Sequence, residues 1–104
     1  MSRRLVIAPL ADQELLAAHD WYEAQRKGLG KEFRTAVRDA LRQIRAHPET
    51  RPPYFRDIRR VRLRRFTSYW VYYRVTDDHI LVITVFHSSR DPEDLAQALG
   101  GTPP

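Results

Sequence analysis

The sequence predicts an α+β domain with the element order β-α-α-β-β-β and a short helix at the C-terminal end. Apolar residues recur every three or four positions in the first half of the chain and every two positions in the second half. An unbroken apolar run, Ile80 to Phe86, is typical of a central strand. A helical hairpin must bury its apolar stripe, so we expect it on one face of a small, mainly antiparallel sheet, with the other face free.

The first 30 residues or so are expected to form one short strand and the first helix. The apolar run from Leu5 to Ile7 stops at Pro9 and predicts the strand. A helix is expected from Asp12, because an apolar stripe with helical spacing begins there. The stripe consists of Ala11, Leu15, Ala18 and Tyr22. The segment Gly28-Leu29-Gly30 then ends this helix.

A second helix is expected from about Lys31 to His47, because Pro48 disfavours helical geometry at the residue before it. Its apolar face consists of Phe33, Ala36, Val37, Ala40, Leu41 and Ile44. Its basic face consists of Arg34, Arg38, Arg42 and Arg45. This pattern is that of an amphipathic helix packed on the sheet through one side.

Three strands are expected after a loop at Thr50 to Pro53. Apolar residues at 61 and 63 alternate with arginines, and those at 71, 73 and 75 alternate with aromatic or basic residues. A turn at Asp77-Asp78 precedes the third strand, and Ser88 to Pro92 leaves the sheet. Glu93 to Leu99 is expected to be helical, and residues 100–104 a frayed tail. Residues 1–104 have the length of one domain.

The composition favours an anionic partner. The chain has 104 residues and a formal net charge of +5, and its cations are arginines apart from Lys27 and Lys31. Arginine pairs in bidentate fashion with carboxylates and phosphates. Nucleic acid, the ribosome and an acidic protein segment are therefore candidate partners. A merely solvated basic surface is the alternative.

Other compositional features narrow the class of protein. There is no cysteine, which excludes disulfides and thiolate metal sites, and we expect no cofactor and no metal. The apolar run before Pro9 is too short for a signal peptide. No stretch approaches the roughly 20 apolar residues of a membrane span. We therefore expect a cytoplasmic protein that does not contact the membrane.

Short motifs occur in a distinctive order along the chain. They are Ala11-Asp12, Trp21-Tyr22-Glu23, Gly30 with Phe33, Pro48, Arg62-Leu63, Arg65-Phe66, Tyr69 to Val75, Val85-Phe86-His87 and Arg90-Asp91-Pro92. No single motif is specific, but the series from Leu5 to about Leu99 resembles the RelE/ParE superfamily of toxins from type II toxin–antitoxin systems. The resemblance implies a growth-arresting toxin, associated with plasmid stabilisation, that a cognate antitoxin neutralises in a hetero-oligomer.

The superfamily is divided in activity. Some members resemble ribosome-dependent ribonucleases that cut messenger RNA, whereas the resemblance to the ParE branch implies binding and inhibition of DNA gyrase. The helix end at Trp21-Tyr22, the long hairpin and the ending from His87 to Pro92 favour the ParE branch. We therefore expect a gyrase inhibitor. The alternative is a metal-independent messenger RNA endoribonuclease.

The ribonuclease alternative needs a base, an acid and cations on the scissile phosphate. The candidates are His87, whose imidazole suits proton transfer near neutral pH, and Arg90. Trp70 stands where the resemblance implies an arginine, and carboxylates follow Arg90 where it implies a basic cluster. The catalytic set is thus incomplete. The other interpretation is a strand-end His87 bonded to backbone and an Arg90 paired with Asp91 or Asp94.

Seven arginines fall between Arg51 and Arg65, against one acid, Asp57. Alternate residues of a strand point to the same side, so some of these arginines should share a face with exposed aromatic rings. The expected surface for the target or for nucleic acid consists of Arg60, Arg62, Arg64, Trp70, Tyr72 and Arg74. The cations would contact phosphates and the rings would stack on bases.

Three other interpretations of this surface stay open. We favour an acidic antitoxin tail that folds on binding as the occupant of much of the exposed hydrophobic and basic surface, with gyrase or the ribosome competing for part of it. A solvated sheet face and a basic nucleic-acid-binding module without toxicity are the remaining two. Trp21 and Tyr22 are expected to pack within the hairpin rather than to act in catalysis.

Overall fold

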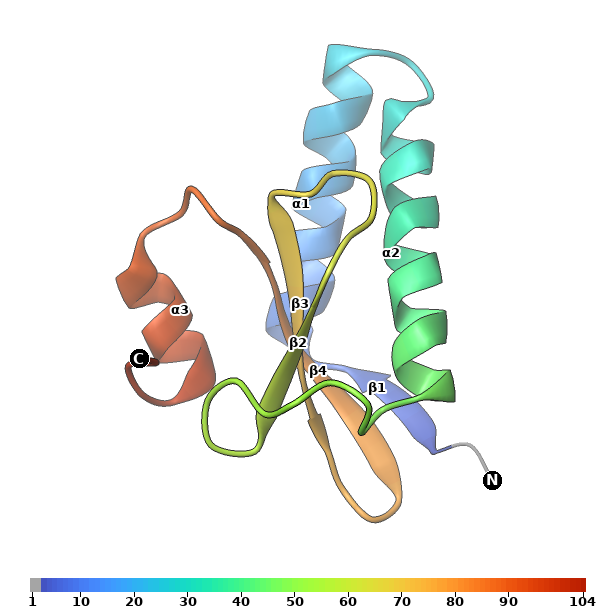
Figure 1. Cartoon of the computed structure of the whole chain (residues 1–104). Coiled ribbons are helices and arrows are strands. Elements are labelled where there is room, and N and C mark those ends of the chain that lie inside the picture. Colours follow the sequence, from blue (N-terminus) through green and yellow to red (C-terminus); the bar gives the residue numbers. More distant parts are fainter. Residues whose placement is uncertain (1–2) are drawn as a thin grey trace.

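The fold of residues 3–104 is described by a computed structural model, and the first two residues of the expected domain lie outside the described residues (Figure 1). The elements are β1 (Arg4–Ile7), α1 (Pro9–Gln25), α2 (Leu29–Ala46), β2 (Ile58–Arg62), β3 (Tyr69–Val75), β4 (His79–His87) and α3 (Pro92–Leu99). This order confirms the predicted α+β fold, including the short C-terminal helix. No helix within residues 3–104 is long and apolar enough to cross a membrane.

The strands form one sheet in the order β1-β4-β3-β2. β3 pairs antiparallel with β2 and β4, whereas β1 runs parallel to β4, with Leu5 opposite Ile80. The register between β3 and β4 shifts at Tyr72 and Tyr73. β1 ends opposite Val82, so the later residues of β4 are left for α1 to cover.

The helical hairpin covers one face of the sheet, as predicted, and encloses the main core (Figure 1). The buried residues of this core are Ala11, Ala18, Phe33, Val37, Ala40, Ile44, Val61, Leu63, Val71, Tyr73, Ile80, Val82 and Val85. Phe33 is fully buried, and its ring centroid lies 5.2 Å from that of Tyr22, 5.4 Å from Phe66 and 5.0 Å from Tyr69. Aromatic packing of this kind joins both helices to the sheet.

Both helices begin earlier than the sequence predicted. α1 begins at Pro9 rather than Asp12, because proline has a φ suited to the first helical position and lacks an N–H that would need a partner. α2 begins at Leu29, directly after Gly28, whose φ of 88° suits glycine. The Glu23 carboxylate fixes this turn by accepting from the N–H groups of Gly28 and Gly30, each at 3.0 Å.

The opposite face of the sheet is not free, which corrects the sequence-based expectation. α3 returns to this face and closes a second core (Figure 1). Its buried residues are Ile58, Tyr72, Phe86, Leu95 and Leu99. The short helix was expected, but its sequence is too short to reveal which surface it covers. Arginines lie on this face near its β2 edge, opposite Tyr72 and Trp70 of β3.

The C-terminal tail differs from the expected frayed segment at its first two residues. Gly100 has a φ of 79° and ends α3, and the N–H of Gly101 donates to the carbonyl of Ala96 at 2.9 Å. Arg56 also donates to the Gly100 carbonyl at 3.2 Å. These contacts form a glycine helix cap that belongs to the folded domain.

Candidate functional site

A cleft of about 420 Å³ lies between α1 and the C-terminal end of β4. We call it the α1 cleft; it is lined by Leu10, Gln13, Glu14, Ala17, Ala18, Trp21, Tyr69, Val85, His87 and Arg90. It brings together both residues that the sequence nominated for RNA cleavage, because His87 ends β4 and Arg90 follows three residues later. Their hydrogen bonds decide what chemistry they can perform.

His87 is held by the turn that follows it. The N–H of Ser89 donates to Nδ1 of His87 at 3.0 Å, and the Ser89 hydroxyl lies 2.8 Å from the same atom. Since Nδ1 accepts from a backbone N–H, the neutral ring carries its proton on Nε2. The nitrogen that could accept a proton is thus already occupied. In this arrangement His87 can donate a hydrogen bond to a ligand but is poorly placed to act as a base.

Arg90 forms an ion pair with Glu14 of α1. The same carboxylate accepts from the Thr84 hydroxyl at 2.7 Å and from the N–H of Val85 at 3.0 Å, and its side chain is only 11% exposed. The Arg90 guanidinium also lies 4.5 Å from the centre of the Phe86 ring. Its charge is therefore compensated within the fold. Arg90 and Glu14 join α1, the uncovered end of β4 and the C-terminal segment.

Tyr69 lies beside His87, with ring centroids 4.9 Å apart and planes at 89°. Burial raises the pKa of Tyr69 to about 12, and the neighbouring Tyr22 adds to this shift. Its hydroxyl stays protonated at neutral pH and cannot serve as a base. The α1 cleft thus offers hydrogen-bond donors and an ion pair rather than a general base.

The second predicted site lies at the β2 edge of the outer face. The guanidinium carbon of Arg60 is 3.8 Å from the centre of the Tyr54 ring and 4.1 Å from that of Trp70. Arg62 lies 5.7 Å from the Trp70 ring. Because Arg60 is stacked between Tyr54 and Trp70, a nucleobase would have to displace it before stacking there. This arrangement favours a preformed cationic surface over a base-stacking platform.

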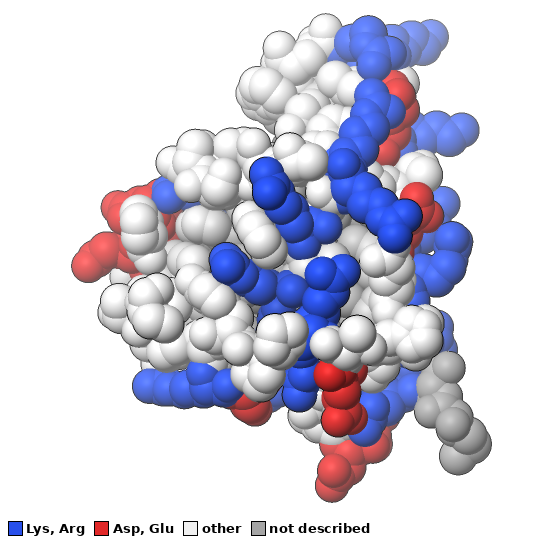
Figure 2. All heavy atoms as spheres, in the orientation of Figure 1, with Lys and Arg blue, Asp and Glu red and all other residues white. Residues whose placement is uncertain are grey.

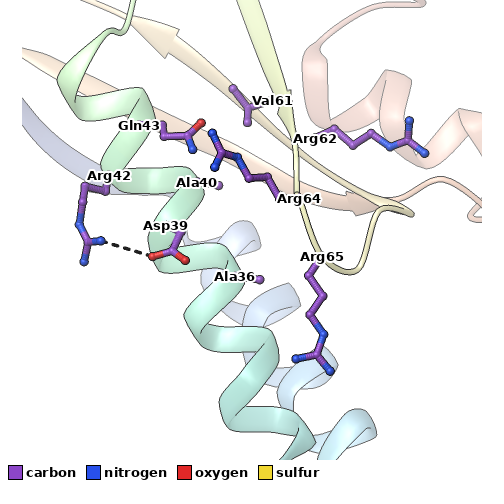
Figure 3. A pocket seen from close by; sticks show the side chains of 9 residues that line it. All are labelled: Ala36, Asp39, Ala40, Arg42, Gln43, Val61, Arg62, Arg64 and Arg65. Atoms are coloured by element: carbon purple, nitrogen blue, oxygen red, sulfur yellow. Dashed lines mark hydrogen bonds and ion pairs between the residues drawn. The ribbon is translucent and has the colours of Figure 1, made fainter.

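Three predicted members of that surface are not available to a ligand as expected, although Tyr72 and Arg74 share the sheet face of Arg60 and Arg62. Tyr72 is 3% exposed in the second core, where burial raises its pKa, so the expectation of an open stacking ring is wrong. Arg74 donates Nε to both carboxylate oxygens of Asp57, at 3.1 and 2.9 Å. β2 ends at Arg62, so Arg64 leaves the strand alternation and turns toward Gln43 of α2 (Figure 3). Of the predicted residues, Arg60, Arg62 and Trp70 therefore form the cationic surface, with Tyr72 buried beneath Arg60.

The sequence did not identify the exposed apolar side of α1. The large hydrophobic side chains exposed among residues 3–104 are Leu10 (40%), Leu16 (64%) and Trp21 (59%). Leu10 and Trp21 line the α1 cleft, while Leu16 borders the groove between the two helices. Tyr22 packs within the hairpin as expected, whereas Trp21 does not. The helical spacing of positions 10, 17 and 21 was the available signal.

No group of histidine, aspartate and glutamate residues within positions 3–104 has the arrangement of a metal site. The side chains that line the described surfaces are mainly arginine, aromatic and apolar. Surfaces of this composition are typical of binding to a macromolecule.

Comparison with known proteins identifies the class. Residues 5–92 match the family model of the ParE toxin of the type II toxin–antitoxin system parDE. The chain is 28% identical over 102 residues to toxin ParE2 of Mycobacterium tuberculosis strains H37Rv and CDC 1551, covering 97% of this chain and 96% of the relative. The protein is therefore a toxin of a type II toxin–antitoxin system. It belongs to the ParE toxin family, and membership implies a cognate antitoxin.

Solved structures agree with the fold. The chromosomal ParDE system of P. aeruginosa contains a chain that matches with a TM-score of 0.62 and 20% identity, covering 83% of this chain and 96% of that one. A mutant of the E. coli toxin RelE in the free state matches with a TM-score of 0.59 and 16% identity, over 98% and 95% of the two chains. At these identities the likeness concerns the fold.

Proposed function

We propose that the protein arrests growth by binding and inhibiting DNA gyrase, and that its antitoxin neutralises it. The observation that carries this proposal is the state of the nominated catalytic pair. Nδ1 of His87 is occupied by Ser89, and the charge of Arg90 is compensated by Glu14. An inhibitor that acts by binding needs neither a free base nor a free cation in this cleft. The ParE family supports the same target.

Two surfaces are available for the two partners of such a toxin. The cationic surface formed by Arg60, Arg62 and Trp70 is our proposed contact for the target. The apolar side of α1, with Leu10 and Trp21 at the α1 cleft, is our proposed contact for the antitoxin. Large exposed apolar side chains favour a protein partner over solvent. On this proposal the protein acts in the cytoplasm.

A gyrase supercoiling assay with the purified toxin tests the proposal. We expect relaxed or cleaved plasmid to accumulate, and prior mixing with the antitoxin to restore supercoiling. Messenger RNA from cells expressing the toxin should stay intact. Normal supercoiling together with transcripts cut at ribosomal positions would contradict the proposal.

The ribonuclease alternative retains one favourable observation, namely that His87 and Arg90 line the same cleft. It predicts that His87→Ala and Arg90→Ala each abolish growth arrest. Because Arg90→Ala also leaves the Glu14 carboxylate unpaired, Arg90→Lys serves as a control that keeps the charge. If the folded His87→Ala and Arg90→Ala variants both remain fully toxic, a catalytic role for this pair is excluded.

A further inference from the structure

A second basic region lies on the α2 side of the molecule. A groove of about 310 Å³ runs between α2 and the segment that joins β2 to β3 (Figure 3). We call it the arginine groove; it is lined by Ala36, Asp39, Ala40, Arg42, Gln43, Val61, Arg62, Arg64 and Arg65. All four of its arginines are exposed, and Asp39 is its one acid. The groove therefore has a clear excess of positive charge.

The two arginines on the strand side are each oriented by one neighbour. Nε of Arg62 donates to the carbonyl of Thr67 at 2.7 Å. With its side-chain oxygen turned toward Arg64, Gln43 accepts from Nη2 at 3.0 Å and from Nε at 3.3 Å. Both contacts use uncharged acceptors, so they fix the guanidinium groups without cancelling their charge. Oriented and uncompensated arginines are ready to bind an anion.

The charges of the other two arginines are partly compensated by neighbouring carboxylates. Arg42 donates to Asp39 at 3.3 Å, and Arg65 pairs with Glu32. All four side chains of these pairs are at least 37% exposed, so water screens the pairs and each contributes little to stability. A polyanion could therefore compete for both cations at small cost.

The four guanidinium groups do not converge on one point. Arg64 points to Gln43 and Arg65 extends along α2, whereas Arg62 points away on the other side of the strand (Figure 3). The Arg62 guanidinium thus belongs to the cationic surface with Trp70, at the rim of the groove. A single phosphate could not contact them all. An extended polyanion with regularly spaced charges fits this distribution better.

The outer side of α2 carries a second set of arginines, which runs from the arginine groove at Arg42 round to the groove shared with α1, lined by Arg34 and Arg38. Its exposed arginines are Arg34, Arg38, Arg42 and Arg45. At 1.5 Å per residue, this row is about 16 Å long. Figure 2 shows basic side chains over α2 and across the adjoining part of the sheet. Since each strand of B-DNA carries a charge about every 3.4 Å along its axis, the row can face several phosphates at once.

We propose that the arginine groove and the α2 arginine row bind the phosphodiester backbone of duplex DNA. No aromatic residue lines the groove, which disfavours single strands, whose bases need stacking platforms. An antitoxin segment that folds on binding needs apolar contacts, and the exposed large hydrophobic residues within 3–104 lie on α1. The choice of DNA over duplex RNA rests on the proposed function, because gyrase acts on DNA.

Fluorescence anisotropy with the purified full-length toxin and a labelled DNA duplex tests this inference without gyrase. The test variant is Arg38→Gln/Arg64→Gln, and the control is Arg4→Gln/Lys27→Gln, which removes the same charge from exposed positions outside the groove. We expect the test variant to lose affinity roughly tenfold at low salt. The slope of log affinity against log salt concentration should fall by the amount expected for about two lost phosphate contacts. The control should lose much less. Thermal unfolding verifies that both variants fold.

The outcomes separate this inference from its alternatives. Equal losses in the two variants, or an unchanged salt slope in the test variant, would overturn it. Tighter binding to a duplex RNA of the same sequence, or displacement of the DNA by polyglutamate at equal charge, would assign the groove to another anion and also overturn it. Failure to bind DNA leaves inhibition of gyrase supercoiling unaffected, so the two proposals fail independently.

Discussion

The two helices of the hairpin pack on the same sheet and yet present opposite surfaces to solvent. α1 carries Asp12, Glu14, Asp20 and Glu23 and no lysine or arginine. α2 carries Lys31 and four arginines against Glu32 and Asp39. Large apolar side chains are exposed on α1, whereas the apolar residues of α2 face the core. The hairpin is therefore polarised into an acidic, apolar helix and a basic one.

The difference shows that two helices packed on the same sheet can present two different binding surfaces to solvent. α2 is strongly amphipathic because its single apolar stripe faces the core. α1 has a second apolar side, which adds nothing to the core and favours association. We accordingly assign α1 to a protein partner and α2 to a polyanion. The following predictions test how far the two helices differ, from the largest expected effect to the smallest.

The largest effect on stability is expected on the side of α2 that faces the core. Phe33→Ala removes a fully buried α2 ring that contacts Tyr22, Phe66 and Tyr69. We expect the free energy of unfolding to fall by about 3–5 kcal/mol in urea titrations. The matched control is Leu16→Ala on exposed α1, which should change it by less than about 0.5 kcal/mol. A similar loss in both variants would contradict the assignment of separate roles.

Trp21→Ala tests the exposed side of α1. The side chain is 59% exposed and meets the fold mainly through an edge-on contact with Tyr22, 5.0 Å between centroids. We expect near-normal stability but antitoxin affinity lowered by about 2 kcal/mol, or about 30-fold, as for an aromatic anchor of an interface. Titration calorimetry against the antitoxin measures this. Unchanged affinity would remove α1 from the proposed interface.

Gly30→Ala tests the close approach of the two helices. A Cβ at this position would lie 2.7 Å from both the ring and the carbonyl oxygen of His19. We expect a loss of about 1–3 kcal/mol of unfolding free energy, because the helices must move apart. His19→Ala, alone and combined with Gly30→Ala, completes a double-mutant cycle. Part of the loss should be recovered in the double variant, and strict additivity would rule out the His19 ring as the cause, leaving the carbonyl oxygen that His19→Ala keeps.

Glu23→Gln tests the turn between α1 and α2 by the pH dependence of stability. The pKa of Glu23 is lowered, first by the hydrogen bond from Gly28 and then by that from Gly30. A lowered folded-state pKa contributes stability above the unfolded pKa, and this contribution is lost as pH falls through the folded pKa. We expect the variant to be less stable than the original protein at neutral pH and the difference to shrink in acid. A difference that is constant with pH would point to lost packing alone.

Much of the fold could be predicted from the sequence because periodicity records which face of an element is buried. The hairpin, the three antiparallel strands and the C-terminal helix were all predicted. The surface that α3 covers was not, because eight residues carry too little pattern to specify a docking face. As a result Tyr72, read as exposed from alternation alone, lies in a second core.

The candidate site was predicted less well because its chemistry depends on pairing across the chain. Strand alternation assigned Arg64 to the outer face, but β2 ends at Arg62 and a turn with Phe66 at a φ of 64° follows. The partner of Arg90 is Glu14, at the other end of the sequence, rather than only the nearby acids first considered. Local sequence cannot reveal such compensation, which decides whether an arginine is available to a ligand.

The parallel pairing of β1 with β4 determines when the toxin can fold. The two strands lie far apart in the sequence, so the sheet closes only after residues 4–82 have all left the ribosome. Contacts between distant residues slow folding, because the chain entropy is lost before they form. Until β4 is complete, the Glu14 carboxylate lacks Thr84, Val85 and Arg90. The nascent chain thus lacks these contacts of the α1 cleft until β4 and Arg90 have left the ribosome, so the folded toxin appears only after that point.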